Sequence, residues 1–204
     1  MYFQNINIWE PKVSPNQFSL ASILIATGSK EQFQGIRAGW IVYQWLNRNH
    51  SRLYTYWTAD GFGKTGCYNT LCPGFIQVNT DIPLGYHFQP ISTYGGKQYE
   101  LGIKIYKDHV TGNWWLVVFD DYVGYWPNSL FTDSGLGHGG NLVSWGGEVY
   151  SPVKEKSPSM TPPLDSLKTF SSTPKCYKVK KDQPLFGQVW TDAIFYGGPG
   201  GCTF

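Results

Sequence analysis

The sequence is poor in charge and has no long apolar run. Asp, Glu, Lys and Arg make up 15% of the 204 residues, against roughly a quarter in a typical soluble domain. The 16 basic and 14 acidic side chains leave a net charge of +2, which is too weak for a nucleic-acid-binding surface. No apolar stretch approaches the roughly 18 residues of a membrane span. We therefore expect that neither a nucleic acid nor a membrane is a partner.

Recognisable metal- and phosphate-binding patterns are also missing. The four cysteines form neither a Cys-x-x-Cys pair nor a Cys/His cluster with zinc spacing. The histidines are scattered at His50, His87, His109 and His138. The Gly-rich segment at 135–140 precedes a predicted strand and not a helix, so it does not match a phosphate-binding loop. The sequence therefore predicts no metal and no cofactor.

The spacing of the cysteines leaves their pairing open. Three pairings are possible, and free buried thiols are the alternative. The four are Cys67, Cys72, Cys176 and Cys202. An even number of cysteines among many aromatic residues is typical of a secreted protein, and Asn49, in Asn-His-Ser, is a candidate glycosylation site. We expect an extracellular protein, and the lack of a signal-peptide pattern after Met1 favours a mature domain.

Aromatic residues and glycine are abundant. Phe, Trp and Tyr make up 17% of the chain, with 24 Gly and 13 Pro, which argues against a helical bundle and against disorder. Apolar and polar residues alternate at 5–9 and 52–57, as in half-buried strands. Further strands are predicted at 18–25, 36–43, 74–78, 99–107, 114–119, 122–126, 141–150 and 189–195. The pattern predicts one all-β sandwich or barrel over residues 1–204, with a Pro- and Ser-rich surface loop at 151–174.

A series of short motifs follows along nearly the whole chain. They include Trp9-Glu10-Pro11-Lys12, Ala38-Gly39-Trp40, Tyr56-Trp57-Thr58-Ala59-Asp60-Gly61, Thr65-Gly66-Cys67-Tyr68-Asn69, Trp145-Gly146-Gly147-Glu148 and Phe195-Tyr196-Gly197-Gly198-Pro199-Gly200. In this order they resemble the neprosin domain, a plant family of secreted glutamic peptidases and their relatives. The resemblance implies an antiparallel β-sandwich of two sheets with a cleft on one face. It also implies disulfides Cys67–Cys72 and Cys176–Cys202, and cleavage of polypeptides at proline by two glutamates in the active members.

The chemistry of such a site depends on a pair of carboxyl groups. Two close carboxyl groups cannot both ionise, so the pair shares a proton. The ionised member activates water, and the protonated member polarises the peptide carbonyl or protonates the leaving amine. By resemblance, Glu148 is one of the two glutamates.

The resemblance also implies that the second glutamate of the pair is missing. By this comparison Arg37 stands at its position, and Ser22 stands at the position of a cleft glutamine. Alternation along the strand places Arg37 on the face opposite Ile36 and Ala38. A guanidinium has no acceptor and stays protonated, so it cannot replace a carboxyl group. We predict an ion pair between Arg37 and Glu148 and a broken catalytic pair; the alternative is that both are solvated surface residues.

Three functions remain open at this point. The leading interpretation is a peptidase-like, monomeric protein that binds a Pro-rich polypeptide or a cell-wall glycan in the cleft. Its predicted ligand-binding residues are Trp40, Trp57, Tyr56 and Trp145, because flat rings stack on proline and sugar rings. The first alternative is an active proline-cleaving endopeptidase that uses Glu148 with another acid such as Glu10. The second is a lectin-like defence protein with its binding site elsewhere.

Overall fold

The structure is a computed structural model that describes residues 1–47, 49–152, 155–156, 158, 178–182 and 193–197. Its strands are β1 (Tyr2–Asn7), β2 (Phe18–Thr27), β3 (Gln34–Tyr43), β4 (Arg52–Thr58), β5 (Cys67–Tyr68), β6 (Ile76–Gln77), β7 (Glu100–Lys107), β8 (Trp114–Val118), β9 (Asp121–Trp126), β10 (Leu142–Tyr150), β11 (Lys178–Asp182) and β12 (Ala193–Gly197). Helical turns are η1 (Lys30–Gln32), α1 (Gln44–Asn47) and η2 (Asn128–Leu130). Within the described residues, no helix has the length and apolar character needed to cross a bilayer.

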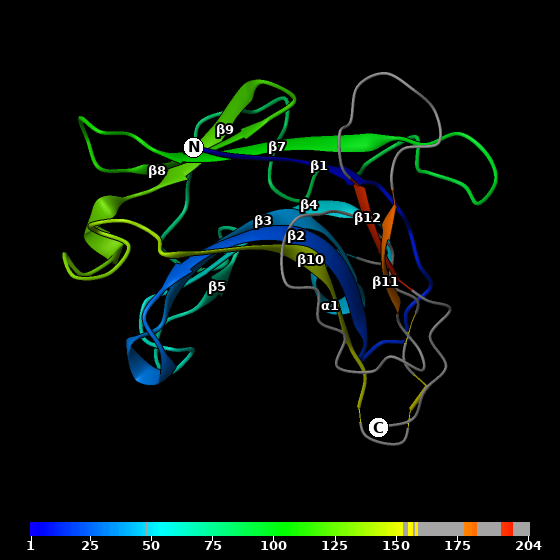
Figure 1. The fold of residues 1–204 in the computed structure, drawn as a ribbon, viewed down its shortest axis with the longest axis horizontal. Coiled ribbons are helices and arrows are strands. Elements are labelled where there is room, and N and C mark those ends of the chain that lie inside the picture. The colour runs from blue at the N-terminus through cyan, green and yellow to red at the C-terminus, as the bar shows by residue number, and fades with distance from the viewer. Residues whose placement is uncertain (48, 153–154, 157, 159–177, 183–192, 198–204) are drawn as a thin grey trace.

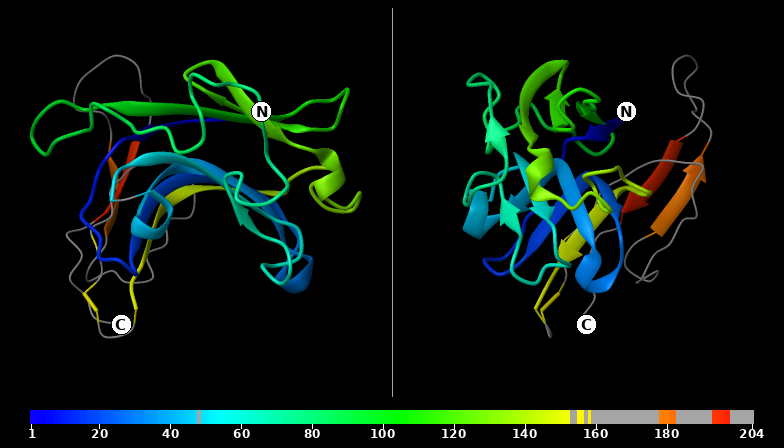
Figure 2. Two further views of the ribbon diagram at one scale, coloured as in Figure 1. Left: turned by 180° about the vertical axis from the view of Figure 1, so that it is seen from behind. Right: turned by 90° about the vertical axis from the view of Figure 1, so that its left-hand side faces the viewer.

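The strands form two large antiparallel sheets and one small one. Sheet I has the order β1-β7-β8-β9-β6, sheet II has the order β10-β2-β3-β4-β5, and β11 pairs with β12. Figure 1 shows sheet I stacked over sheet II, and Figure 2 shows the same layers from behind. Sheet II is strongly curved, and its concave face points away from sheet I. We call this the outer face. The prediction of an all-β antiparallel sandwich is confirmed.

The inner faces of the two sheets enclose the main core. Ile23 of β2, Ile36 of β3 and Ile103 of β7 are completely buried there, as the alternation of apolar residues requires. Trp40 is also fully buried, and its indole Nε1 donates a hydrogen bond to the backbone oxygen of Asn7 at 2.8 Å. This bond satisfies the one polar atom of a large apolar side chain and ties sheet II to β1 of sheet I.

A second, smaller cluster lies on the outer face of sheet II. Leu20 of β2, Ile41 of β3 and Tyr54 of β4 are buried there. Strand β2 is therefore buried on both faces, because β10 and β3 flank it and apolar side chains cover it on either side. This explains why residues 20–26 read as an almost unbroken apolar run.

Several predicted strands differ from the observed ones. The first strand is Tyr2–Asn7 and not 5–9. The Ile8 N–H still bonds to the Tyr99 oxygen in register with β7, but the Ile8 oxygen accepts from Ser92, and the strand ends there. Strand β6 is only Ile76–Gln77. Strand β12 spans Ala193–Gly197, and residues 189–192 of the predicted strand at 189–195 lie outside the described residues; β11 was not predicted. Most of the predicted surface loop at 151–174 lies outside the described residues.

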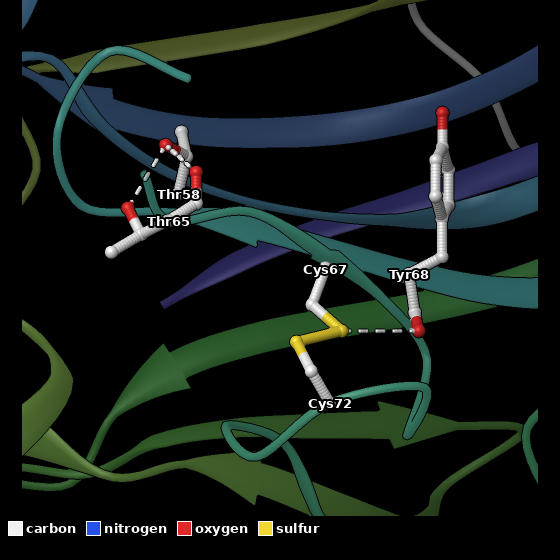
Figure 3. Close-up of a disulfide and its surroundings, with 5 residues drawn as sticks. All are labelled: Thr58, Thr65, Cys67, Tyr68 and Cys72. Atoms are coloured by element: carbon white, nitrogen blue, oxygen red, sulfur yellow. Dashed lines mark hydrogen bonds between the residues drawn. A yellow bond between two sulfur atoms is a disulfide. The ribbon is translucent and has the colours of Figure 1, made fainter. Parts of the chain in front are cut away.

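One of the two expected disulfides lies within the described residues. Cys67 is bonded to Cys72, and Figure 3 shows the bridge with the Tyr68 side chain pointing away from it. Cys67 packs into the main core and Tyr68 against the outer cluster, as alternation along β5 requires. The expected Cys176–Cys202 bridge lies outside the described residues. Asn49, the candidate glycosylation site, is exposed.

The curvature of sheet II requires glycine at position 39. A Cβ on Gly39 would overlap the carbonyl oxygen of Ala21 and lie 2.7 Å from Ser22 Cα. Backbone atoms of a central strand cannot move aside, so we expect Gly39→Ala to lower the free energy of unfolding by about 1–3 kcal/mol. Gly146→Ala is the matched control, since nothing lies within 4 Å of its Cβ position. Urea denaturation of both variants tests this; equal stability of the two would contradict it.

Candidate functional site

The site residues converge on the outer face of sheet II. In the strand register, Ser22 of β2 lies opposite Gly146 of β10 on one side and Gly39 of β3 on the other. Gly39 in turn lies opposite Tyr54 of β4. Gly146, Ser22 and Gly39 therefore form a row of small residues across the centre of the outer face.

Arg37 and Glu148 lie on either side of this row. Arg37 is opposite Leu24 and Glu148 is opposite Leu20, so the two flank Ser22 along the strand direction. Because the outer face is concave, side chains that rise from it converge. The Arg37 Nη1 atom donates to Glu148 Oε2 at 2.6 Å. The predicted ion pair is therefore present, and its side chains are 25% and 47% exposed.

The surroundings keep Arg37 charged. Burial by itself lowers the pKa of this guanidinium, but electrostatic interactions with Tyr54 and Glu148 outweigh burial and raise the pKa above its usual value. A short, charge-assisted hydrogen bond of this kind is among the stronger polar contacts in proteins. Its exposure nevertheless limits its contribution to stability to about 0–1 kcal/mol.

Three tyrosines lie around the ion pair with raised pKa values. Burial raises the pKa of Tyr54 to about 12, while the neighbouring Arg37 opposes the shift. The Tyr54 hydroxyl lies close to Ser22 and Arg37 but makes no hydrogen bond of good geometry. Burial also raises the pKa of Tyr56 and of Tyr68. All three phenols are therefore neutral at physiological pH, and the charges on this part of the outer face belong to Arg37 and Glu148.

Aromatic rings line the outer face at both ends. Beside Arg37, the Tyr56 ring contacts Tyr68 with 4.7 Å between centroids and stacks on Phe62 at 6.0 Å. Beside Glu148, the Phe18 ring contacts Tyr43 and Tyr150, each at 5.6 Å. Phe62 and Tyr150 are 62% and 52% exposed. The ion pair thus sits between two groups of partly exposed rings.

The predicted ligand-binding residues are only partly on this face. Tyr56 is there, but Trp40 and Trp57 are buried between the sheets at 0% and 7% exposure. Rings enclosed in this way offer no surface to a ligand, so the prediction is corrected for Trp40 and Trp57. Trp145 packs against the same core but is only partly buried, and its role stays a prediction. The sequence already contained this information, because residues an odd number of positions apart on one strand point to opposite faces of the sheet. By that rule Trp40 cannot share the face of Arg37.

Glu10 does not lie beside Glu148. Its Oε2 atom accepts a hydrogen bond from the backbone N–H of Ser51 at 2.9 Å, directly before β4. Three inter-strand spacings separate β4 from β10, a distance of about 14 Å. Glu10 instead contacts His50 and His87 at 3.4 and 3.5 Å. Sequence reasoning missed this cluster because its members are far apart in the chain.

Together these features define a class of protein: a two-sheet antiparallel sandwich with a charged pair and aromatic side chains on the concave face of one sheet. A comparison with protein families places the chain more narrowly. The family model described as Neprosin matches residues 15–162, well over half of the chain. The chain belongs to the Neprosin family. The matched region contains β2–β10 and therefore every residue of the outer face described above.

The buried Tyr54 predicts how stability responds to alkaline pH. Its folded pKa of about 12 lies above the ordinary value of 10. The corresponding stability is fully present below pH 10 and is lost as pH rises through about 12, a loss of about 2–3 kcal/mol. We expect Tyr54→Phe to reduce this loss and to change stability little at pH 8, since the hydroxyl makes no good hydrogen bond.

Urea denaturation at several pH values between 8 and 12 measures this effect, with an absorbance titration of the tyrosines as a second readout. Tyr94→Phe is the control, because Tyr94 is 79% exposed. The interpretation is wrong if the wild type and Tyr54→Phe lose stability in parallel.

Proposed function

We propose that this Neprosin-family chain is a secreted binding protein that does not cleave peptide bonds. The observation that carries the proposal is the ion pair between Arg37 Nη1 and Glu148 Oε2 at 2.6 Å. A glutamic peptidase needs a second carboxyl group beside the first, so that one is protonated while the other is ionised. Among the described residues, the charged partner of Glu148 is a permanent cation, which neither accepts a proton from water nor shares one with Glu148.

The remaining polar groups near Glu148 do not supply the missing function. Ser22 and Tyr54 carry hydroxyl groups, and the raised pKa of Tyr54 makes it a poor base at physiological pH. Glu10, the candidate substitute acid, is held near Ser51 at the far side of sheet II. These placements argue against an active endopeptidase that relies on Glu148 with Glu10.

The outer face suits an extended ligand. Tyr56 is opposite Arg37, and Phe18 is opposite Tyr43, six positions further along β3. Six residues of strand correspond to about 20 Å, which matches about six residues of an extended polyproline helix. Aromatic grooves bind such helices because proline rings stack on flat side chains and the helix is already ordered before binding. We therefore favour a Pro-rich polypeptide as the ligand, with a cell-wall glycan as the competing outcome.

Secretion is part of the same proposal. The Cys67–Cys72 disulfide supports an oxidising environment, and the exposed Asn49 is accessible for glycosylation.

The first test is for peptidase activity. We expect no cleavage of a Pro-rich polypeptide between pH 2 and pH 8 above the level of a Glu148→Gln control. Loss of a general acid or base typically removes about 10²–10⁴-fold of the rate. Mass spectrometry of the digest detects any products. Robust cleavage that Glu148→Gln abolishes would show that the catalytic pair is intact and would overturn the proposal. Arg37→Glu places a second carboxyl group beside Glu148. Cleavage by this variant would show that the second carboxyl group is the only catalytic feature that the wild type lacks.

The second test is for binding. We expect Phe62→Ala to weaken the binding of a proline-rich peptide about tenfold, or about 1.4 kcal/mol, because an exposed ring in the contact is lost. Phe3→Ala is the matched control, since Phe3 is similarly exposed on sheet I. Isothermal titration calorimetry with the peptide and with cellulose-derived oligosaccharides separates the two ligand classes. Binding of the oligosaccharide alone, or equal effects of both substitutions, would contradict the peptide proposal.

A further inference from the structure

Three potential metal ligands meet at one edge of the molecule, away from the outer face. Glu10 follows β1, His50 lies between α1 and β4, and His87 lies in the segment between β6 and β7. One donor atom of each lies within 4.8 Å of the others. The residues are 40 and 37 positions apart in the chain, so only the fold brings them together.

The distances fit metal coordination better than hydrogen bonding. His50 Nδ1 and His87 Nε2 lie 3.4 and 3.5 Å from Glu10 Oε2, beyond the usual 2.7–3.2 Å of an N–H···O bond. Nε2 of His87 is buried and has no hydrogen-bond partner among the described residues. Zinc lies about 2.0–2.2 Å from imidazole nitrogen and carboxylate oxygen, so neighbouring ligands of a tetrahedral ion are about 3.3 Å apart. The two contacts with Glu10 match that spacing.

We propose that Glu10, His50 and His87 bind one zinc ion. Two imidazoles and one carboxylate are a ligand set that suits zinc, whereas magnesium and calcium prefer oxygen ligands alone. Three protein ligands leave a fourth position for water, which is the arrangement of open zinc sites. The ion would join the segment after β1 to the segment before β4 and to the segment between β6 and β7.

Two of the ligands are already held in place. The backbone N–H of Ser51 donates to Glu10 Oε2 at 2.9 Å, which orients the carboxylate in the manner of an outer-shell partner. His87 forms a β-bridge with Arg52, and the neighbouring Phe88 N–H donates to the Ser51 carbonyl oxygen. The nearby guanidinium of Arg52 is directed to the carbonyl oxygen of Gly85 at 2.7 Å and does not pair with Glu10.

The site is also accessible from solvent. His50 is exposed, with 47% of its side chain accessible. Glu10 lines a surface pocket together with Gln89, Pro90 and Ile91. Solvent therefore reaches two of the three ligands, Glu10 and His50, directly.

Zinc binding to the full chain tests the proposal. The protein is treated with chelator, dialysed and titrated with zinc chloride by isothermal titration calorimetry, with thermal unfolding in parallel. We expect one zinc per chain and a rise in Tm of about 5–10 °C at about 100 times the dissociation constant. Cobalt as a probe should give the visible absorption of a tetrahedral site. His50→Ala and His87→Ala should each weaken zinc binding more than about 100-fold. This loss is larger than the loss expected when a residue that only hydrogen-bonds to a metal ligand is removed.

Two further variants keep the result interpretable. Glu10→Gln retains an acceptor for the Ser51 N–H, so it should weaken zinc binding while the apo protein stays folded. His109→Ala is the matched control, because the His109 side chain is 95% exposed and outside the cluster. The proposal is overturned if the wild type binds no zinc at micromolar concentrations. It is also overturned if His109→Ala weakens binding as much as the ligand variants, or if the ligand variants bind zinc like the wild type.

Discussion

The packing of the two sheets against each other decides what the outer face presents. Once Ile36, Ala38 and Trp40 of β3 point into the core, the strand alternation directs Arg37, Gly39 and Ile41 to the opposite side. The same constraint acts on β2 and β10. Once the inward-facing residues of a strand are set, alternation also sets its outward-facing residues. The core and the candidate site therefore result from the same packing of the two sheets. A shift of one residue in register would place Arg37 in the core, at a large cost in free energy.

Curvature is the second physical feature on which the site depends. The row Gly146, Ser22 and Gly39 carries almost no side-chain volume, and the Gly39 backbone approaches that of β2 too closely for any Cβ. Small residues therefore allow β2 and β3 to approach each other closely. Arg37 and Glu148 form their ion pair across this row.

The two glutamates of interest have very different surroundings. Glu148 is neutralised by a permanent cation and is nearly half exposed. Glu10 faces two imidazoles at distances too long for good hydrogen bonds and receives one backbone N–H. The first arrangement suits a fixed binding surface. The second places one carboxylate oxygen and two imidazole nitrogens within 4.8 Å of one another, which is the basis of the proposed zinc site.

The sequence by itself determined the all-β class and the face of β3 on which Arg37 lies, because alternation with a period of two reports on burial directly. The pairing of Arg37 with Glu148 was expected from the resemblance to a family and not from the strand pattern. The sequence did not place Glu10 near His50 and His87, and it did not end β1 at Asn7. The first depends on how three segments 40 and 37 positions apart come together, and the second on a contact between Ile8 and the distant Ser92. Side-chain direction within a strand is a local property, whereas the meeting of three separate segments is decided only by the tertiary structure.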